Sequence, residues 1–253
     1  MDDLWNGNYY KSHSDLQQAG AFEILDTFSF KGDEHVLDIG CGPGTISKRI
    51  ADAVPQGKVI GIDPSMSMLA QALTDYKDVA NLKFFCQKAE DFQLDWQFDV
   101  VTSFHALHFV KDKQRVFEQI KASLNPNGKV LIQVGSRFHP YMTDILKRPR
   151  WKSMHTFEYR SFPFPLDEAR ALLKSLGFTL TRAVEKKEPY LFASKEALEK
   201  WLLGWLSYPS GLTGQPLTEL AAEFAESFCQ NENRRSDIPL SFSPLIIEAC
   251  LAQ

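Results

Sequence analysis

The sequence predicts an α/β protein built on a largely parallel sheet with helices on both faces. Short apolar runs, typical of buried strands, alternate with longer amphipathic stretches that are typical of helices. A glycine-rich turn also joins the first strand directly to a helix, as expected where parallel strands are connected by helices. The chain has 253 residues, 44% of them hydrophobic and 24% charged, which suits a single globular domain over residues 1–253.

The apolar runs place seven strands along the chain. They are expected at Val36–Ile39, Lys58–Ile62, Leu82–Cys86, Asp99–Ser103, Lys129–Val134, Thr179–Val184 and Pro244–Leu251. Helical patterns are expected at residues 15–28, Thr45–Ala53, Ser67–Tyr76, Lys113–Ser123, Leu166–Leu176, Lys195–Trp205 and Thr218–Cys229. Gly177 gives one of these helices its C-terminal stop, and Asn125-Pro126-Asn127-Gly128 gives another a turn at its exit.

Residues 135–165 interrupt this regular pattern. The stretch is rich in Arg, Lys, His, Pro and aromatic residues, and we expect an insertion after the fifth strand that forms a substrate lid. Its basic residues either form a solvated face or bind an acid, since a guanidinium can hold a carboxylate through two hydrogen bonds. Candidate substrate contacts are His139, Arg150 and Arg160; Trp151, Phe157, Tyr159, Phe162 and Phe164 either wall the pocket or pack the lid.

Composition and charge exclude several classes of protein. The net charge of −4 gives no electrostatic footprint for nucleic acid, and no apolar run approaches the roughly twenty residues of a membrane span. The N-terminus lacks the basic and apolar regions of a signal peptide. Cys41, Cys86, Cys229 and Cys250 lie far apart, so we expect neither disulfides nor a metal site, and a cytoplasmic protein, with a monomer as the default.

The most specific motif is Val36-Leu37-Asp38-Ile39-Gly40-Cys41-Gly42-Pro43-Gly44, which runs from a buried strand into a helix. Its three glycines allow a tight turn and the close approach of a ligand. Asp63 ends the next strand about twenty residues later, where an acidic side chain binds the ribose hydroxyls of an adenine nucleoside. The two features together predict a nucleoside site.

Two ligands compete for this site. A dinucleotide requires the spacing G-x-G-x-x-G, and here the third glycine comes one residue early. Asp38 would also repel a pyrophosphate, whereas it can pair, directly or through water, with the ammonium of an amino-acid tail. S-adenosylmethionine (SAM) carries such a tail and NAD does not, so the motif favours SAM.

The segment Asp38–Gly44 with Asp63 resembles the first two motifs of the class I SAM-dependent methyltransferases. Lys88-Ala89-Glu90-Asp91-Phe92, the segment Phe98–Phe109 and Leu124-Asn125-Pro126-Asn127-Gly128-Lys129 are similar to later motifs of that family, in the same order. Residues 9–14 with Gln17, and residues 190–196 with Trp201 and Leu202, look like the trans-aconitate, juvenile-hormone-acid and biotin-pathway malonyl-carrier O-methyltransferases. The resemblance implies a Rossmann-like, seven-stranded, mostly parallel sheet, with residues 1–30 as a helical cover over the cofactor.

The resemblance also implies roles for individual residues. Cofactor contacts are expected at Tyr9, Gln17, Asp38, Gly40, Cys41, Gly42, Gly44, Asp63, Pro64, Met66, Ala89, Glu90, Asp91 and Ser103. Asp91 is slightly favoured over Glu90 for the adenine amino group. His105 and His108 lie near the reacting centre or are simply packed histidines, and Tyr10 and His13 are expected to contact the substrate. No metal is expected, and the cofactor product is S-adenosyl-L-homocysteine (SAH).

The methyl acceptor is the open question. A carboxylate is already ionised at neutral pH and needs no general base, in keeping with the lack of an obvious catalytic dyad; a hydroxyl would need one, and His105 or His108 is the candidate. We expect O-methylation of a small-molecule or carrier-bound acid. A C-methyltransferase of a quinone- or sterol-like substrate and a catalytically silent SAM-binding partner protein are the alternatives. Nucleic-acid N-methylation is disfavoured, because Ser103-Phe104-His105-Ala106 departs from the motif of those enzymes.

Overall fold

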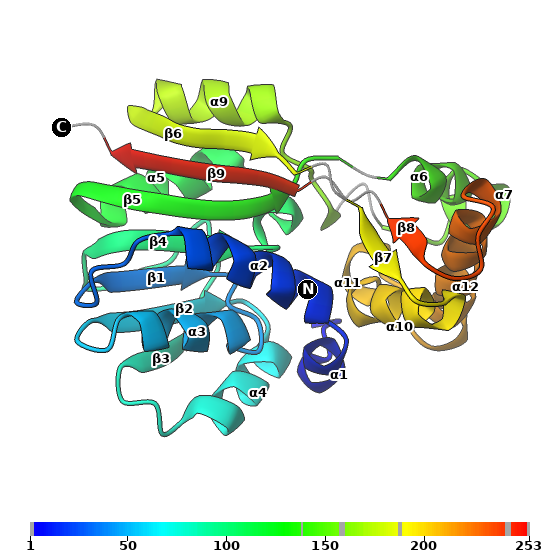
Figure 1. The fold of residues 1–253 in the computed structure, drawn as a ribbon, viewed down its shortest axis with the longest axis horizontal. Helices are drawn as coiled ribbons and strands as arrows, with labels where there is room; N and C mark the ends of the chain where they lie inside the picture. The colour runs from blue at the N-terminus through cyan, green and yellow to red at the C-terminus, as the bar shows by residue number, and fades with distance from the viewer. Residues whose placement is uncertain (1–2, 138, 157–159, 187–188, 241–243, 252–253) are drawn as a thin grey trace.

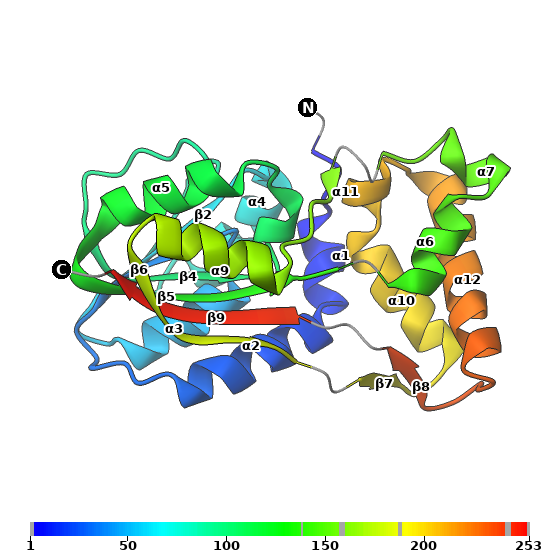
Figure 2. The ribbon, with the colours of Figure 1, turned by 90° about the horizontal axis from the view of Figure 1, so that it is seen from above.

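The structure, a computed structural model, describes residues 3–137, 139–156, 160–186, 189–240 and 244–251. Two parts lie side by side (Figure 1). We call the seven-stranded sheet with its covering helices the sheet half. Residues 139–156 and 190–240 form the second part, the helical half, and the short helix α1 (Gly7–Ser12) lies between the two (Figures 1 and 2).

The sheet has the predicted number of strands and the predicted mostly parallel arrangement. Its strands are β1 (His35–Ile39), β2 (Lys58–Asp63), β3 (Leu82–Cys86), β4 (Phe98–Phe104), β5 (Leu124–Gly135), β6 (Phe178–Glu185) and β9 (Pro244–Leu251). Their order is β3-β2-β1-β4-β5-β9-β6. β9 runs antiparallel to both of its neighbours, while β1 to β5 pair in parallel. The Rossmann-like fold expected from the sequence is therefore confirmed.

Alternation along the strands creates one apolar core on each face of the sheet. Val36 packs with α2 (Asp15–Thr27) and α3 (Thr45–Ala53), and its neighbour Leu37 packs with α5 (Lys113–Ser123) and α9 (Leu166–Ser175) on the opposite face (Figure 2). The helix α4 (Met66–Tyr76) packs against β2 and β3 at the sheet edge. Because both faces are covered, the central strands β1 and β4 are buried along nearly their whole length.

Local sequence signals account for several helix ends. The carboxylate of Asp112 accepts a hydrogen bond from the Arg115 amide at 2.9 Å and so caps the start of α5. Ser65 does the same for α4, with the Met68 amide at 3.1 Å. Gly177 takes a positive φ of 85° after α9, the backbone conformation that glycine favours at a helix C-terminus.

The helical half has a core of its own. Trp151 and Phe224 are fully buried in it, with other apolar side chains from α6 (Pro140–Leu146), α7 (Pro149–Lys152), α10 (Lys195–Trp205) and α12 (Gly214–Asn231). A helix α11 (Ser207–Ser210) and a two-stranded antiparallel sheet of β7 (Tyr190–Phe192) and β8 (Ile238–Leu240) complete it. None of the helices within the described ranges has the length and apolar character that crossing a membrane requires.

The structure changes one expectation about the lid. The sequence indicates an insertion confined to residues 135–165, but α6 and α7 from this stretch pack on α10 and α12, which come from the C-terminal part of the chain (Figure 1). Each element alone leaves an apolar face uncovered, so the two segments fold together. Phe157 and Tyr159, proposed as pocket walls, lie outside the described residues.

Candidate functional site

The glycine-rich turn after β1 is held open by its backbone geometry. Gly40, Gly42 and Gly44 have φ angles of +72°, +53° and +81°, which other residues adopt only at a cost. A Cβ on Gly40 would lie 2.1 Å from the Cβ of Ala106, whereas one on Gly42 would meet nothing within 4 Å. The turn is therefore packed on one side and open on the other.

Asp63 lies beside this open side. Its carboxylate is 8% exposed and accepts hydrogen bonds from the amides of Gly42 and Ser65, both at 2.9 Å. Burial raises the pKa of Asp63 to about 6, and the two amide hydrogen bonds limit the rise. A carboxylate has about four acceptor positions, so two remain for the two hydroxyls of a ribose. The residues present thus fit an adenine nucleoside.

Asp38 lies near the end of β1, just before the glycine turn. Its two carboxylate oxygens accept hydrogen bonds from the hydroxyls of Ser47, at 2.6 Å, and Thr102, at 2.9 Å. The side chain is 1% exposed, and burial raises its pKa to about 6. Asp38 therefore ties β1 to α3 and β4, and its contact with the ammonium of SAM, direct or through water, stays a prediction.

Ser103, expected near the cofactor, lies within β4. It is fully buried, and its hydroxyl donates a hydrogen bond to the carbonyl of Ile39 at 2.8 Å, which joins β4 to β1 within the sheet. Ala89 packs in the core beneath α5. Cys41 is 5% exposed, and burial raises its thiol pKa well above the ordinary value, so it fills space beside the turn and does not act as a nucleophile.

The two acidic residues after β3, Glu90 and Asp91, differ in exposure. Asp91 is exposed, whereas Glu90 is half-buried. Burial raises the pKa of the Tyr208 phenol, and the charges of Glu90, Asp63 and Asp3 raise it further. Glu90 and Asp63 therefore both lie near Tyr208. Pro64 and Met66, after β2, are both exposed at this edge of the sheet.

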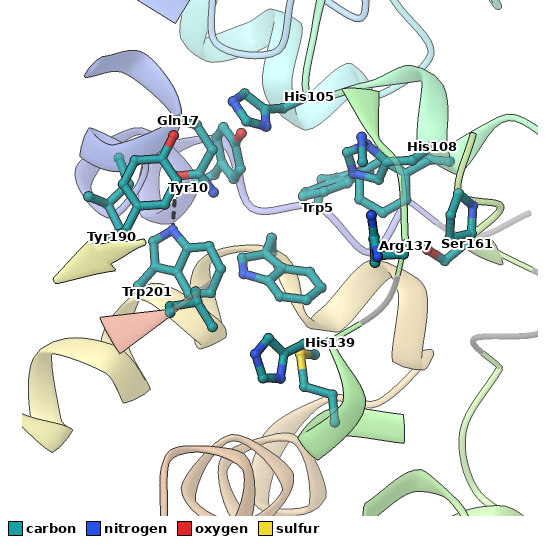
Figure 3. Close-up of a pocket in the computed structure, with 17 residues that line it drawn as sticks. Trp5, Tyr10, Gln17, His105, His108, Arg137, His139, Ser161, Tyr190 and Trp201 are labelled. Atoms are coloured by element: carbon teal, nitrogen blue, oxygen red, sulfur yellow. Dashed lines mark hydrogen bonds between the residues drawn. The ribbon is translucent and has the colours of Figure 1, made fainter. Parts of the chain in front are cut away.

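A cavity of about 870 Å³, counting its open mouth, lies between the sheet half and the helical half. Its walls are mostly aromatic or apolar (Figure 3). The lining residues are Trp5, Tyr10, Leu16, Gln17, His105, His108, Phe109, Gly135, Arg137, His139, Met142, Ser161, Pro163, Tyr190, Trp201, Trp205 and Leu240. Burial raises the pKa of Tyr10 and the charge of Asp63 adds to the rise, so the cavity adjoins the nucleoside site.

The two histidines expected near the reacting centre both line this cavity. Burial lowers the pKa of His105 to about 4, and a hydrogen bond to Gln133 offsets part of the fall. Burial lowers the pKa of His108 to about 3, with smaller contributions from the charges of His105 and Lys113. Both imidazoles are neutral at pH 7. His105 also has a φ of +54°, a strained conformation of the kind found at functional sites.

Some of the other predicted contact residues line the cavity and others do not. Gln17 lines the cavity and accepts a hydrogen bond from the indole of Trp201 at 3.0 Å (Figure 3). Tyr10 and His139 also line it. Tyr9 does not: its ring stacks on that of His13, with centroids 4.0 Å apart, outside the described lining.

Two arginines proposed for the substrate lie elsewhere. Arg150 is half exposed and pairs with Glu219 and Glu223 of α12 on the outer side of the helical half. Arg160 donates to the carbonyl of Tyr208 at 3.3 Å and lies over its ring. Arg150 is thus balanced by two carboxylates of the helical half, whereas Arg160 has one hydrogen bond to a neutral carbonyl, and neither is among the residues that line the cavity.

Several residues that line the cavity were not predicted as site residues from the sequence. Trp5, Arg137 and Trp205 come from three separate segments, and Tyr190 and Trp201 were noted only as part of a resemblance. No local motif marks these residues, because the cavity exists only where the two halves meet. Among the described residues, no group of three His, Cys, Asp or Glu side chains is arranged to hold a metal ion.

Comparison with known proteins agrees with this geometry. A family model described as a methyltransferase domain matches residues 36–128, the stretch that contains the glycine turn, Asp63 and His105. The trans-aconitate 2-methyltransferase of Deinococcus radiodurans is 26% identical over 217 residues, which are 81% of each chain. The chain is a class I SAM-dependent methyltransferase. Its cofactor is SAM, for which the turn and Asp63 provide the fitting residues.

Solved structures resemble the methyltransferase in fold. Haemonchus contortus phosphoethanolamine N-methyltransferase 2, in complex with SAM, has a TM-score of 0.62 and 21% identity; the match covers 93% of the methyltransferase and 53% of that protein. The YcgJ protein of Bacillus subtilis has a TM-score of 0.63 and 19% identity, over 93% and 99% of the two chains. At these identities the likeness establishes the fold alone.

Proposed function

We propose that the methyltransferase methylates a carboxylate oxygen of a small-molecule acid. The observation that carries this proposal is the state of the histidines in the cavity. Groups with pKa values of about 4 and 3 are poor general bases at pH 7, because an efficient base has a pKa near the working pH. An alcohol or phenol needs such a base, whereas a carboxylate has no proton to lose.

The proposed cofactor contacts follow from the geometry around Asp63. The two remaining acceptor positions of Asp63 receive the ribose hydroxyls. The open side of Gly42 leaves room for SAM to pass close to the turn, and Glu90 approaches the adenine. When bound, SAM supplies an electrophilic methyl group on a positively charged sulfur, and the C–S electron pair remains on sulfur after transfer. Tyr10 and Gln17 extend this site toward the cavity.

The chain's own contribution is orientation and the exclusion of water. The half-buried His105 and His108 line the cavity as neutral imidazoles, and aromatic side chains close the walls. Held in this cavity, an acid is placed against the methyl group with little rotational freedom, and its carboxylate loses most of its hydration. The name of the Deinococcus radiodurans relative, trans-aconitate 2-methyltransferase, supports an acid as acceptor.

The test uses SAM labelled in its methyl group and a panel of acids, phenols, alcohols and amines. A methyl ester releases labelled methanol in mild base, while methyl ethers and methylamines do not. We expect base-labile label with at least one acid, and a value of kcat that changes little between pH 7 and pH 9 at saturating SAM. Transfer only to phenols or amines would refute carboxylate methylation.

A further inference from the structure

The charge of the cavity identifies the class of acid. Arg137 is the only Lys or Arg among the described lining residues, and its guanidinium is paired with Glu185 of β6. His105 and His108 are neutral, and burial lowers the pKa of His139 below its ordinary value as well. The described lining therefore offers no positive charge that a carboxylate of the protein does not already balance.

This lack of free positive charge limits how many carboxylates the cavity can take up. Moving a carboxylate out of water has a high cost unless charges or hydrogen bonds replace its hydration. An acid with three carboxylates would need several cations, and arginine is the residue that supplies them best. The two further arginines proposed for this role, Arg150 and Arg160, are bonded to protein groups outside the described lining.

Two neutral polar groups belong to residues that line the cavity and have no partner within the described protein. The indole Nε1 of Trp205 and the phenol oxygen of Tyr190 are buried, and neither has a hydrogen-bond partner in the described structure. Buried donors are nearly always paired in native proteins, so an orphaned pair in a cavity wall points to partners on a ligand. The Tyr190 oxygen and the amide nitrogen of Gln133 both lie close to Gly20, since a Cβ built on this glycine would be 2.7 Å from the first and 3.3 Å from the second. Gln133 is also the hydrogen-bond partner of His105.

The remaining walls recognise an apolar body. Trp5 and Phe109 lie with their rings 5.4 Å apart, edge to face, and Trp201 and Trp205 are similarly arranged at 5.5 Å. Met142 and Leu240 also line the cavity from the helical half. Such walls gain free energy when they cover apolar surface and offer nothing to additional charges.

We propose that the acceptor is an acid with one carboxylate on a bulky apolar body, its oxygens received by neutral N–H and O–H groups and its body by the aromatic walls. The proposal rests on the carboxylate methylation proposed above and narrows it. The chemistry of the cavity thus separates this chain's acceptor from the tricarboxylate named for the Deinococcus radiodurans relative.

The first experiment compares kcat/KM for octanoate, octanedioate and trans-aconitate, with methyl esters detected by base-labile label. Octanoate and octanedioate have the same number of carbons and differ by one carboxylate. We expect octanoate to exceed octanedioate at least ten-fold, and trans-aconitate to be the poorest of the three. A preference for octanedioate or trans-aconitate, with an ester product, overturns this inference and leaves carboxylate methylation in place.

The second experiment replaces Trp205 by Phe, which keeps an aromatic ring and removes the N–H. We expect KM for octanoate to rise several-fold while the affinity for SAH stays the same, which also shows that the variant is folded. Trp151→Phe is the matched control, because its indole donates to Glu223 at 2.8 Å within the helical half and does not line the cavity. An unchanged KM for Trp205→Phe contradicts the assigned donor.

A third result would bear on both proposals. If no acid of the panel yields base-labile label while a phenol or an amine is methylated, carboxylate methylation is refuted, and the acid class inferred from it is refuted too. The nature of the product therefore tests the function, and the order of the three acids tests the inference.

Discussion

At the level of single residues, two buried carboxylates of similar pKa do different work. Asp38 is 1% exposed and accepts hydrogen bonds from the hydroxyls of Ser47 and Thr102, which join β1 to α3 and β4, while Asp63 accepts one from the amide of Gly42 and lies beside the open side of the glycine turn. Both pKa values are raised to about 6 by burial. The sequence places both acids correctly at strand ends, yet it does not distinguish these roles, which depend on which hydroxyls the fold brings near.

The role of Asp63 is tested by Asp63→Asn. The amide keeps the shape of the side chain and removes the negative charge that makes hydrogen bonds to hydroxyls strong. We expect the affinity for SAH, measured by calorimetry at pH 7, to fall on the order of ten-fold. Asp95→Asn, an equivalent change on an exposed residue outside the expected cofactor contacts, is the control and should leave the affinity unchanged. Equal losses in both variants would contradict the assignment.

The raised pKa of Asp63 also predicts a pH dependence of stability. Since its folded pKa of about 6 lies above the ordinary value of 3.8, the folded state binds the proton more tightly. The unfavourable contribution of the buried charge is therefore fully present above pH 6 and is relieved as the pH falls from 7 to 5, by about 1 kcal/mol. Chemical denaturation of the wild type and of Asp63→Asn at both pH values measures this effect. From pH 7 to pH 5 the free energy of unfolding of the wild type should rise by that amount relative to the variant.

Two glycines in the same turn should respond differently to alanine. In Gly40→Ala the new Cβ collides with Ala106, so we expect a loss of about 3 kcal/mol in the free energy of unfolding. Gly42→Ala meets open space and pays only for its positive φ, about 1 kcal/mol. We expect the latter variant to bind SAH more weakly, because the new methyl group lies where the ligand passes. Denaturation measures the two losses of stability, and calorimetry measures the affinity for SAH. An unchanged affinity in Gly42→Ala would show that the open side of the turn faces away from the ligand.

At the level of elements, the N-terminal segment joins the two halves across the cavity. Asp3 accepts hydrogen bonds from Ser65 and Ser67 of the sheet half, at 2.9 and 3.0 Å, and Ser207 of the helical half donates to the Leu4 carbonyl at 2.9 Å. The Trp5 ring stacks on Tyr208 at 5.2 Å. These contacts make α1 part of the cavity wall.

The importance of Trp5 for this segment is measurable by hydrogen exchange. Trp5→Ala removes ring contacts with Tyr10, Phe109 and Tyr208, each of which contributes about 0.5–1.5 kcal/mol. We expect faster exchange of the α1 amides while the amides of β1 and β4 exchange at the wild-type rate, since the sheet core does not include Trp5. Unchanged protection of α1 would show that its other contacts suffice.

At the level of the whole molecule, the sequence predicts the sheet well and the cavity poorly. Several strands and helices match their expected bounds, α5 and β3 among them, because apolar alternation and capping residues are local signals. Trp205 and Tyr190 carry no such signal. They reach the cavity only through the packing of α10 on α12 and the pairing of β7 with β8, contacts between segments distant in the sequence.

The placement of the cofactor relative to the cavity is tested most directly by a crystal structure of the methyltransferase with SAH. We expect both ribose hydroxyls within hydrogen-bonding distance of the Asp63 carboxylate, and the sulfur at the end of the cavity formed by Tyr10, Gln17 and His105. A ribose bound away from Asp63, or a sulfur turned away from the cavity, would contradict the assignment of the cavity as the acceptor site.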